Sequence, residues 1–398
     1  MPKVNPEILR WARETAGLSP EEATQKLKIG DARGETAVDR LLALEVGDKE
    51  PTRPMIVKMA KQYRRPLLTF YMSAPPRKGD RGQDFRTLPD GYSDAHNALV
   101  DALIRDVKAR QGMVRATMVD EEEAEPLPFV GSARVSDGVP ALVASIQNKL
   151  GIDREDFRGE PSPHYAFNLL RERTELAGVF VLLISNLGSH HTTIDLEYFR
   201  GLTLADDIAP FIIINDQDAR SAWSFTLLHE LVHLWLGQTA ISGARSESDI
   251  ERFCDDIAGE FLLPNDEIAQ FDIDDTADFQ TILNQISTYA DSRNVSSSMV
   301  TYKLYRRGMI DRDTWARLSE TFRRLWLANR SRKRMEQRDK EGGGPSYFVV
   351  RQHRVGKALI NFVDRMMASG AITTSKAGKV LGVKAQKVQT LVDMGRSL

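Results

Sequence analysis

The sequence contains a single cysteine, Cys254, among 398 residues. No disulfide can form within the chain, which fits a reducing compartment. The first residues, MPKVNPEILRWARE, lack the apolar stretch of a secretory signal, and the sequence has no run of about 20 apolar residues that could span a membrane. The formal net charge of -2 argues against a protein that coats nucleic acid through bulk charge, but the charges are unevenly distributed and leave room for local basic faces. We therefore expect a soluble cytoplasmic protein.

The apolar content, 41% of the residues, is enough for the cores of two or three domains. Two segments rich in proline, glycine or charge are typical of connections between domains. The stretch before the first of them has helical spacing and a clear helix start at Ser19-Pro20-Glu21-Glu22. We predict five parts: a helical domain over 1–72, a linker over 73–94, a central domain over 95–329, a hinge over 330–344 and a small helical domain over 345–398.

Two β-branched apolar runs in the central domain, 177–184 and 209–215, predict strands of a half-buried sheet. Helical patterns dominate from Ala219 onward. We therefore predict a mainly helical α+β fold with a small sheet. We expect the run 211–215 at the edge of that sheet, where an extended peptide would bind as an added strand.

The strongest chemical signal is HELVH at 229–233, within the apolar segment FTLLHELVHLWL. This segment lacks proline and glycine and is long enough for three helical turns, so we predict a buried helix. His229 and His233 project from one face and reach one Zn²⁺ at about 2.0 to 2.1 Å, while Glu230 lies beside them to activate water. In the alternative, a structural motif without metal, three polar groups are buried unpaired at about 1 to 3 kcal/mol each.

A catalytic zinc needs a third protein ligand and an open position for water. The segment 250–263 predicts a second helix, which Pro264 ends. Glu251 and Asp255 share one face of it, so Glu251 can ligate zinc while Asp255 accepts the N–H of a zinc-bound histidine. Glu260 competes for the ligand role, but nine residues beyond Glu251 it points to the opposite side. The alternative for Glu251 is a first-turn carboxylate that only stabilises the helix dipole.

These residues predict peptide hydrolysis. Zinc lowers the pKa of its bound water towards ~7 and polarises the scissile carbonyl, while Glu230 takes the water's proton and passes it to the leaving amine. The candidates that could stabilise the resulting oxyanion are Tyr302 and Tyr305, or His190 and His191. The histidine pair is more simply explained as an exposed strand end or loop.

Three segments between Phe199 and Pro264, namely FRGLTLADDIAPFIIIN, FTLLHELVHLWLG and ERFCDDIAGEFLLP, resemble the ImmA/IrrE family of bacterial and phage metallopeptidases. The family's usual asparagine is Asp255 here, which keeps a hydrogen-bond acceptor and adds charge. The resemblance implies a gluzincin-type zinc endopeptidase whose protein substrate is a transcriptional repressor or antitoxin-like regulator, as in mobile-element transfer, phage induction or the response to DNA damage. It places the zinc ligands and the catalytic base on His229, His233, Glu251 and Glu230.

These proteins often carry an N-terminal helix-turn-helix of the Xre type, and residues 1–72 resemble one. LALEVGDKEPT is similar to the motif that ends its recognition helix, here 35–46, with 21–27 as the positioning helix. The alternative is a domain that docks another helix-turn-helix protein or packs on the peptidase. The predicted DNA contacts are Thr36, Asp39 and Arg40 to base edges, and Arg33, Lys49, Arg53 and Lys58 to phosphates.

The tail segment AGKVLGVK, 377–384, is similar to part of a repressor-style helical hairpin and would serve as an interaction module; its role stays open. Two hypotheses from different classes follow for the whole chain. In the first it is a zinc endopeptidase with a fused DNA-binding or docking domain. In the second it is a DNA-binding transcriptional regulator or antitoxin whose zinc site is structural or sensory. They differ at Glu230, because only a peptidase needs that carboxylate as a base.

Overall fold

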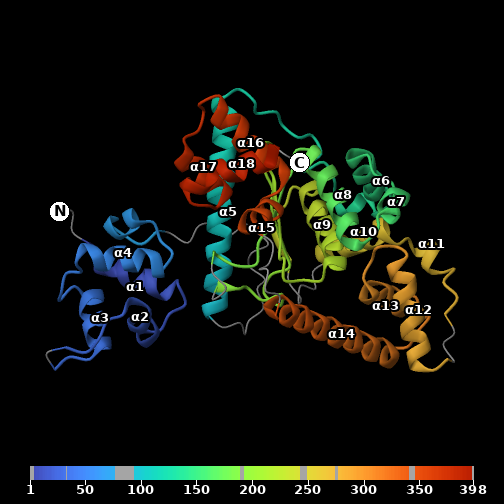
Figure 1. Cartoon of the computed structure of the whole chain (residues 1–398), viewed down its shortest axis with the longest axis horizontal. Helices are drawn as coiled ribbons and strands as arrows, with labels where there is room; N and C mark the ends of the chain where they lie inside the picture. The colour runs from blue at the N-terminus through green and yellow to red at the C-terminus, as the bar shows by residue number, and fades with distance from the viewer. Residues whose placement is uncertain are drawn as a thin grey trace. The chain divides into compact units, whose positions relative to one another are not determined.

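The structure is a computed structural model with a mainly helical α+β fold and one four-stranded sheet, as predicted (Figure 1). Its contacts divide the chain into two compact units, residues 1–106 with 186–194, and residues 107–185 with 195–398. Within the part of the chain described, no helix has the length and apolarity needed to cross a membrane. The described residues are 4–32, 34–76, 94–188, 192–242, 249–273, 277–339 and 346–396.

The N-terminal unit begins with a bundle of short helices around one apolar core. Helix α2 starts where the sequence predicts, because Ser19 and Glu22 form a reciprocal capping box. The predicted recognition helix starts two residues late, at Ala37, because Thr36 is its N-cap. The elements are α1 (Pro6–Glu14), α2 (Pro20–Leu27), α3 (Ala37–Val46), α4 (Arg53–Gln62) and the 3-10 helix η1 (Leu67–Tyr71).

A buried ion pair joins α1 to α3 inside this core. The Nε and Nη2 atoms of Arg13 donate to the two carboxylate oxygens of Glu45 at 2.7 and 2.8 Å. Both side chains are buried, and the paired hydrogen bonds raise the pKa of Arg13 above its usual value. A bidentate pair of this kind fixes the relative position of two helices, and loss of either partner leaves an uncompensated buried charge.

We therefore expect Glu45→Ala to destabilise the N-terminal bundle by about 3 to 5 kcal/mol. Denaturant unfolding of the full chain would show this as an early transition assigned to that bundle. Glu35→Ala is the matched control, because Glu35 forms an exposed pair with Lys49 that contributes about 1 kcal/mol or less. Equal effects of the two substitutions would contradict a stabilising role for the buried pair.

The second unit is built on a sheet with strand order β1-β3-β2-β4. Strand β1 (Phe180–Leu183) is parallel to β3 (Phe211–Ile214), while β2 (Gly201–Leu204) is antiparallel to β3 and to β4 (Ala240–Ser242). The two predicted apolar runs are therefore strands, but the expectation that 211–215 forms the sheet edge is wrong. Strand β3 lies between β1 and β2, and β4 is an edge strand.

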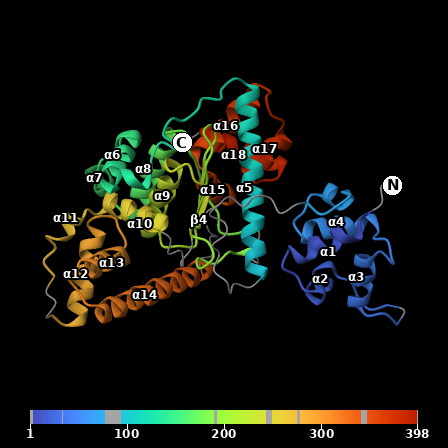
Figure 2. The same ribbon diagram turned by 180° about the vertical axis from the view of Figure 1, so that it is seen from behind.

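Helices cover both faces of this sheet (Figures 1 and 2). One face carries the HExxH helix α9, which packs on β2 and β3, and α8, which packs on β1. Helix α10 packs on α9. The other face carries the C-terminal helices and the end of α5, whose Gln111 donates to the carbonyls of Leu204 and Ala209 at 3.0 Å. The helices of the region are α5 (Asp94–Asp120), α6 (Val139–Leu150), α7 (Arg154–Gly159), α8 (Pro163–Leu176), α9 (Arg220–Trp235), α10 (Asp249–Leu262), α11 (Asn265–Ile268), α12 (Phe279–Asp291) and α13 (Ser297–Arg306).

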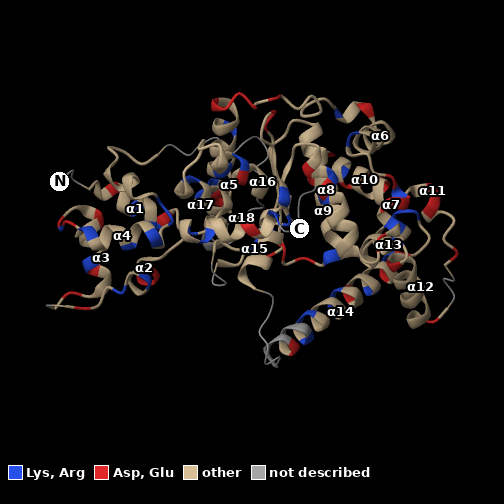
Figure 3. Ribbon diagram, turned by 45° about the horizontal axis from the view of Figure 1, so that its top comes forward, with Lys and Arg blue, Asp and Glu red and all other residues tan. Residues whose placement is uncertain are grey.

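The chain continues into α14 (Arg312–Asp339), a long helix with Lys and Arg along it (Figure 3). It runs through the first ten residues of the predicted hinge 330–344, because Arg, Lys, Met, Glu and Gln are good helix formers. The rest of that hinge, and most of the linker 73–94, lie outside the described residues. The last helices are α15 (Tyr347–Val355), α16 (Lys357–Ala368), α17 (Thr374–Leu381) and α18 (Val388–Arg396), with the 3-10 turn η5 (Ala385–Lys387) before α18.

Candidate metal centre and substrate cleft

The packing of α10 against α9 brings the candidate metal ligands together. Helix α9 carries His229, Glu230 and His233 on a segment that is almost entirely buried, as the apolar flanks predict. Helix α10 carries Glu251 in its first turn and Asp255 one turn later. His229 and His233 lie within the core, and Glu251 is buried against them. Residues 22 positions apart in the sequence thus share one site.

The three predicted ligands point their donor atoms at a common centre. The Nε2 atoms of His229 and His233 are 3.3 Å apart, and the Glu251 carboxylate oxygens lie 3.2 Å from the first and 3.4 Å from the second. Ligand atoms held tetrahedrally at 2.0 to 2.1 Å from one ion are about 3.3 to 3.4 Å from each other. The separations therefore match those between zinc ligands, with a different oxygen of Glu251 facing each histidine.

The outer nitrogen of each histidine has its own neighbour. Asp255 Oδ1 lies 2.8 Å from His229 Nδ1, and Cys254 Sγ lies 3.9 Å from His233 Nδ1. A carboxylate that accepts the Nδ1 proton leaves Nε2 unprotonated and able to bind a metal. Cys254 also forms a possible three-residue metal group with the two histidines. However, its sulfur faces the side of the His233 ring away from Glu251, so Glu251 fits the shared centre better.

The electrostatics of the cluster favour positive charge at its centre. Burial alone would lower the pKa of His229, but hydrogen bonds to Asp255 and Glu251 outweigh it and raise the pKa to about 10. Burial would likewise raise the pKa of Glu251, but hydrogen bonds from His229 and His233 lower it to about 2. The negative charges of Glu251 and Asp255 thus favour a positive charge between them. A proton on His229 can supply that charge, and so can a bound metal cation.

Glu230 projects from the same helix towards the sheet. Its Oε2 accepts a hydrogen bond of 2.7 Å from Thr203 Oγ1 on β2. Its Oε1 is buried and makes no hydrogen bond of good geometry among the described residues, and the hydroxyl of Ser242 on β4 is the neighbouring group that acts on this carboxylate. Burial raises the pKa of Glu230, while the nearby His229 and His233 pull it down. A buried carboxylate beside the candidate metal ligands, with its pKa raised by burial, is suited to accept a proton.

Gly201 on β2 makes this position of Glu230 possible. A Cβ atom at Gly201 would lie 2.1 Å from Glu230 Oε1 and 2.6 Å from its carboxyl carbon, which is a severe overlap. Sequence reasoning missed both Gly201 and Thr203. The available signal was a glycine within an apolar β-type run, which often marks a close approach of another group to the backbone.

The competing carboxylate, Glu260, lies away from the histidines. Its two oxygens accept from the backbone N–H of Asn265, and one lies 3.7 Å from Lys303 Nζ. Glu260, near the end of α10, thus caps the start of α11. The structure brings Glu251, and not Glu260, to His229 and His233, in keeping with the helical spacing.

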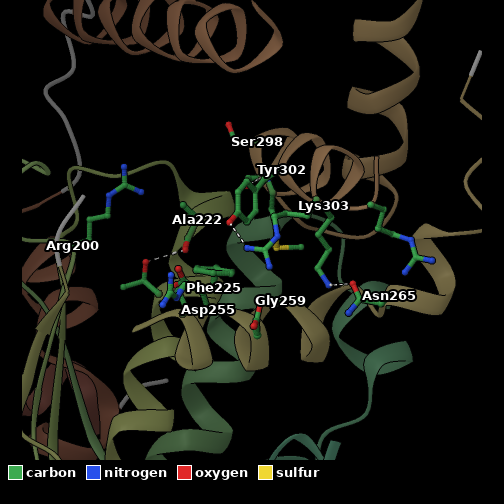
Figure 4. Close-up of a pocket in the computed structure, with 16 residues that line it drawn as sticks. Arg200, Ala222, Phe225, Asp255, Gly259, Asn265, Ser298, Tyr302 and Lys303 are labelled. Atoms are coloured by element: carbon green, nitrogen blue, oxygen red, sulfur yellow. Dashed lines mark hydrogen bonds between the residues drawn. The ribbon is translucent and has the colours of Figure 1, made fainter. Parts of the chain in front are cut away.

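A cavity of about 480 Å³ opens beside the cluster, between α9, α10 and α13 (Figure 4). Asp255 and Phe225 connect it to the metal site, since Asp255 contacts His229 and the Phe225 and His229 rings are 6.5 Å apart. Basic side chains outnumber acidic ones in its lining. The charged residues are Arg200, Arg252, Lys303, Arg306 and Arg307, against Asp255 and Asp256.

The structure separates the two tyrosine candidates for oxyanion stabilisation. Tyr302 lines the cavity, and its hydroxyl accepts a 3.0 Å hydrogen bond from Arg306 (Figure 4). Tyr305 instead stacks on Trp315, with ring centroids 4.8 Å apart. His190 and His191 lie outside the described residues. Tyr302 is therefore the candidate that the fold directs into the cleft.

Several predicted DNA contacts of the N-terminal bundle are used within that bundle. Thr36 and Asp39 form the capping box that starts α3. Arg40 donates to the carbonyl of Gly30, which holds the turn before α3. All three predicted base contacts therefore have a local structural role.

Three of the residues predicted to contact phosphates are exposed. Lys49 pairs with the exposed Glu35, whereas Arg53 and Lys58 are exposed on α4. Arg33 lies outside the described residues. The structure thus leaves α4 as the better-equipped basic element of this domain.

Comparison with known families gives one match, in the central part of the chain. Residues 182–305 match the family model Peptidase M78, described as an IrrE N-terminal-like domain. The matched segment runs from β1 to α13 and includes the HExxH helix, Glu251 and Tyr302. This part of the chain is thus similar to the ImmA/IrrE-type peptidases, which supports a metallopeptidase domain. The searches of curated proteins and of solved structures found no match.

We expect the purified protein to bind about one zinc ion per chain, and Glu251→Ala to lose most of it. Metal content after dialysis, measured by inductively coupled plasma mass spectrometry, tests this. Glu260→Ala is the matched control, because it removes the same type of side chain from the same helix, away from the cluster. Zinc retained by Glu251→Ala and lost by Glu260→Ala would overturn the ligand assignment.

Proposed function

We propose that the chain is a zinc-dependent endopeptidase that cleaves a protein regulator, a repressor or an antitoxin-like protein. The observation that carries this proposal is the approach of the His229 and His233 Nε2 atoms and the Glu251 carboxylate to within 3.2 to 3.4 Å of one another, with Glu230 beside them. The match of residues 182–305 to a peptidase family supports the reaction class. The nature of the substrate rests on the resemblance to the ImmA/IrrE proteins alone.

Zinc held by these ligands would activate a water molecule and polarise the scissile carbonyl. The chain's own groups manage the protons. As the water oxygen bonds to the carbonyl carbon, Glu230 accepts one proton from that water. Glu230 then donates the proton to the amide nitrogen as the C–N bond breaks. Thr203 holds one oxygen of Glu230 by a hydrogen bond, which leaves Oε1 for this transfer.

The cavity beside the cluster is the proposed substrate cleft. Its excess of basic side chains favours a peptide with acidic residues near the scissile bond, because opposite charges in a partly enclosed site attract more strongly than in water. The hydroxyl of Tyr302, polarised by Arg306, is the proposed donor to the developing oxyanion. Strand β4, an edge strand paired with β2, would align the substrate backbone.

We further propose that the N-terminal bundle brings the peptidase to its substrate, by binding DNA or by docking the regulator itself. Arg53 and Lys58 on α4 are the exposed basic residues that support contact with an anionic partner. The alternative function is a transcriptional regulator with a structural or sensory zinc site. The position of Glu230 argues against it, because a purely structural site has no use for a buried carboxylate that lies beside the two histidines without joining Glu251 as a ligand.

Substrate trapping with Glu230→Gln tests the proposal. The substitution keeps the shape of the side chain and removes the base, so we expect cleavage to fall by at least about 100-fold while zinc content stays unchanged. Tagged wild-type and variant proteins would be recovered from the source cells and their bound proteins identified by mass spectrometry. A regulator that is intact with the variant and shortened with the wild type is the expected result.

Glu260→Gln is the matched control for the trap and should cleave like the wild type. Recovery of the same intact partners by the wild type and Glu230→Gln would contradict the peptidase proposal and favour the regulator alternative.

We expect Gly201→Ala to act like a loss of the base. The added methyl group overlaps three atoms of the Glu230 side chain and forces it away from its position. Cleavage of the trapped substrate should fall about 100-fold, with zinc content near that of the wild type. Gly112→Ala in α5 is the control, since a methyl group added there would meet no neighbouring atom within 4 Å. Full activity of Gly201→Ala would show that Glu230 does not need its present position.

A further inference from the structure

The C-terminal helices form a compact three-helix unit with the plan of a helix-turn-helix. Helix α16 packs on both α17 and α18, and α17 contacts η5 and α18. Each helix has a buried apolar face, including Val363 from α16, Leu381 from α17, and Val388 and Leu391 from α18. Phe362 of α16 lies against Phe180 of β1, with ring centroids 6.1 Å apart. Figures 1 and 3 show α17 and α18 beside one another.

The turn between α17 and η5 is short and built on two glycines. Gly382 ends α17 in the left-handed region, at φ 65°. A Cβ atom at Gly378 would lie 2.9 Å from the carbonyl oxygen of Val383 and 3.2 Å from the backbone nitrogen of Ala385. These contacts are with backbone, which cannot easily move. Glycine at this position therefore allows the following helix to fold tightly back on α17.

An arginine from α15 holds this turn. Arg351 Nη2 donates to the carbonyls of Leu381 and Gly382, both at 2.7 Å. Lys387 Nζ lies 3.6 Å from the centre of the Tyr347 ring, which ties η5 to α15. The two helices on either side of the turn are thus held in one geometry, as a DNA-reading pair must be.

The surface of this hairpin is basic although the chain as a whole is slightly acidic. From the start of α17 to the end of α18, residues 374–396 contain four lysines and one arginine against a single acidic residue, Asp393. Gln386 is exposed in η5, and on α18 Gln389 and Thr390 are exposed on the side opposite the buried Val388 and Leu391. The Gln389 amide donates to Asp393 Oδ1 at 2.8 Å, one turn along the helix. Further exposed residues lie at the start of α17 and before η5. Together with those of η5 and α18 they make up what we call the hairpin face: Thr374, Ser375, Lys384, Gln386, Gln389 and Thr390.

We propose that the hairpin face binds double-stranded DNA, with η5 and α18 in the major groove. Gln386 and Gln389 carry the amide groups that pair with adenine edges, and Thr390 can bond to either type of base. Lys384 and the hydroxyls of Thr374 and Ser375 would contact phosphates on either side of the groove. This is a DNA-binding function separate from the proposed role of the N-terminal bundle, and it does not depend on the peptidase reaction.

The test uses the full chain and a 30-base-pair duplex of random sequence, with affinity measured by fluorescence anisotropy at several salt concentrations. Lys384→Glu combined with Gln389→Glu places negative charge on the hairpin face. We expect about a tenfold weaker affinity and a salt slope reduced by about one. DNA binding by the N-terminal bundle is common to all variants and does not affect this comparison.

Lys149→Glu combined with Gln280→Glu is the matched control. It makes the same change in charge at exposed positions of α6 and α12, on other helices of the same unit, and should leave affinity and slope unchanged. Equal losses in the two double variants, an unchanged affinity of the first, or no binding by the wild type would overturn the proposal.

A gain-of-function variant covers the case in which the first double variant fails to fold, as judged by circular dichroism. Thr390→Lys adds a positive charge to the exposed side of α18, away from the buried Leu391. We expect it to strengthen DNA binding about threefold and to raise the salt slope by about one. No gain in affinity from this folded variant would also overturn the proposal.

Discussion

The contact between α9 and α10 is the interaction on which the central domain depends. It closes a buried cluster in which two histidines and a glutamate face one point, with donor atoms 3.2 to 3.4 Å apart. Charged and polar groups are costly to bury unless they compensate each other or share a cation. The cluster is therefore both the best-defined candidate site in the described chain and the point where α9 and α10 must keep their register.

The sheet also contributes to this site, through a strand on which α9 packs. Strand β2 supplies Thr203, which holds one oxygen of Glu230, and Gly201, whose missing side chain leaves room for the other. The same strand pairs with β4 at the sheet edge, next to which a substrate backbone would lie. One four-residue strand thus positions the proposed base and links it to the proposed substrate path.

Sequence patterns were sufficient where the chemistry lies within one helix. The apolar flanks of HELVH predicted the buried α9, and the spacing of Glu251, Asp255 and Glu260 predicted which of them could face the histidines. Gly201, Thr203 and Cys254 could not be assigned, because their roles arise from strand pairing and helix packing that a local pattern does not contain. The order of strands in the sheet also depends on this pairing between distant segments, which is why β3 was wrongly expected at an edge.

The expected hinge at 330–344 shows the opposite limitation. Its charged, polar composition is typical of a connection, yet the same residue types favour a helix, and α14 continues to Asp339. In the N-terminal bundle, residues chosen as DNA contacts for their polarity proved to be the caps that start α3. Polar residues near a helix start serve the helix first, and this can hide whether they also bind a partner.

The most direct measurement of the central site is a crystal structure of the zinc-loaded protein with anomalous diffraction collected at the zinc edge. The expected result is a single peak about 2.0 to 2.2 Å from His229 Nε2, His233 Nε2 and a Glu251 oxygen, with Glu230 close by but not bound. A peak held by Cys254 and the two histidines, or no peak between α9 and α10, would contradict the proposed catalytic centre.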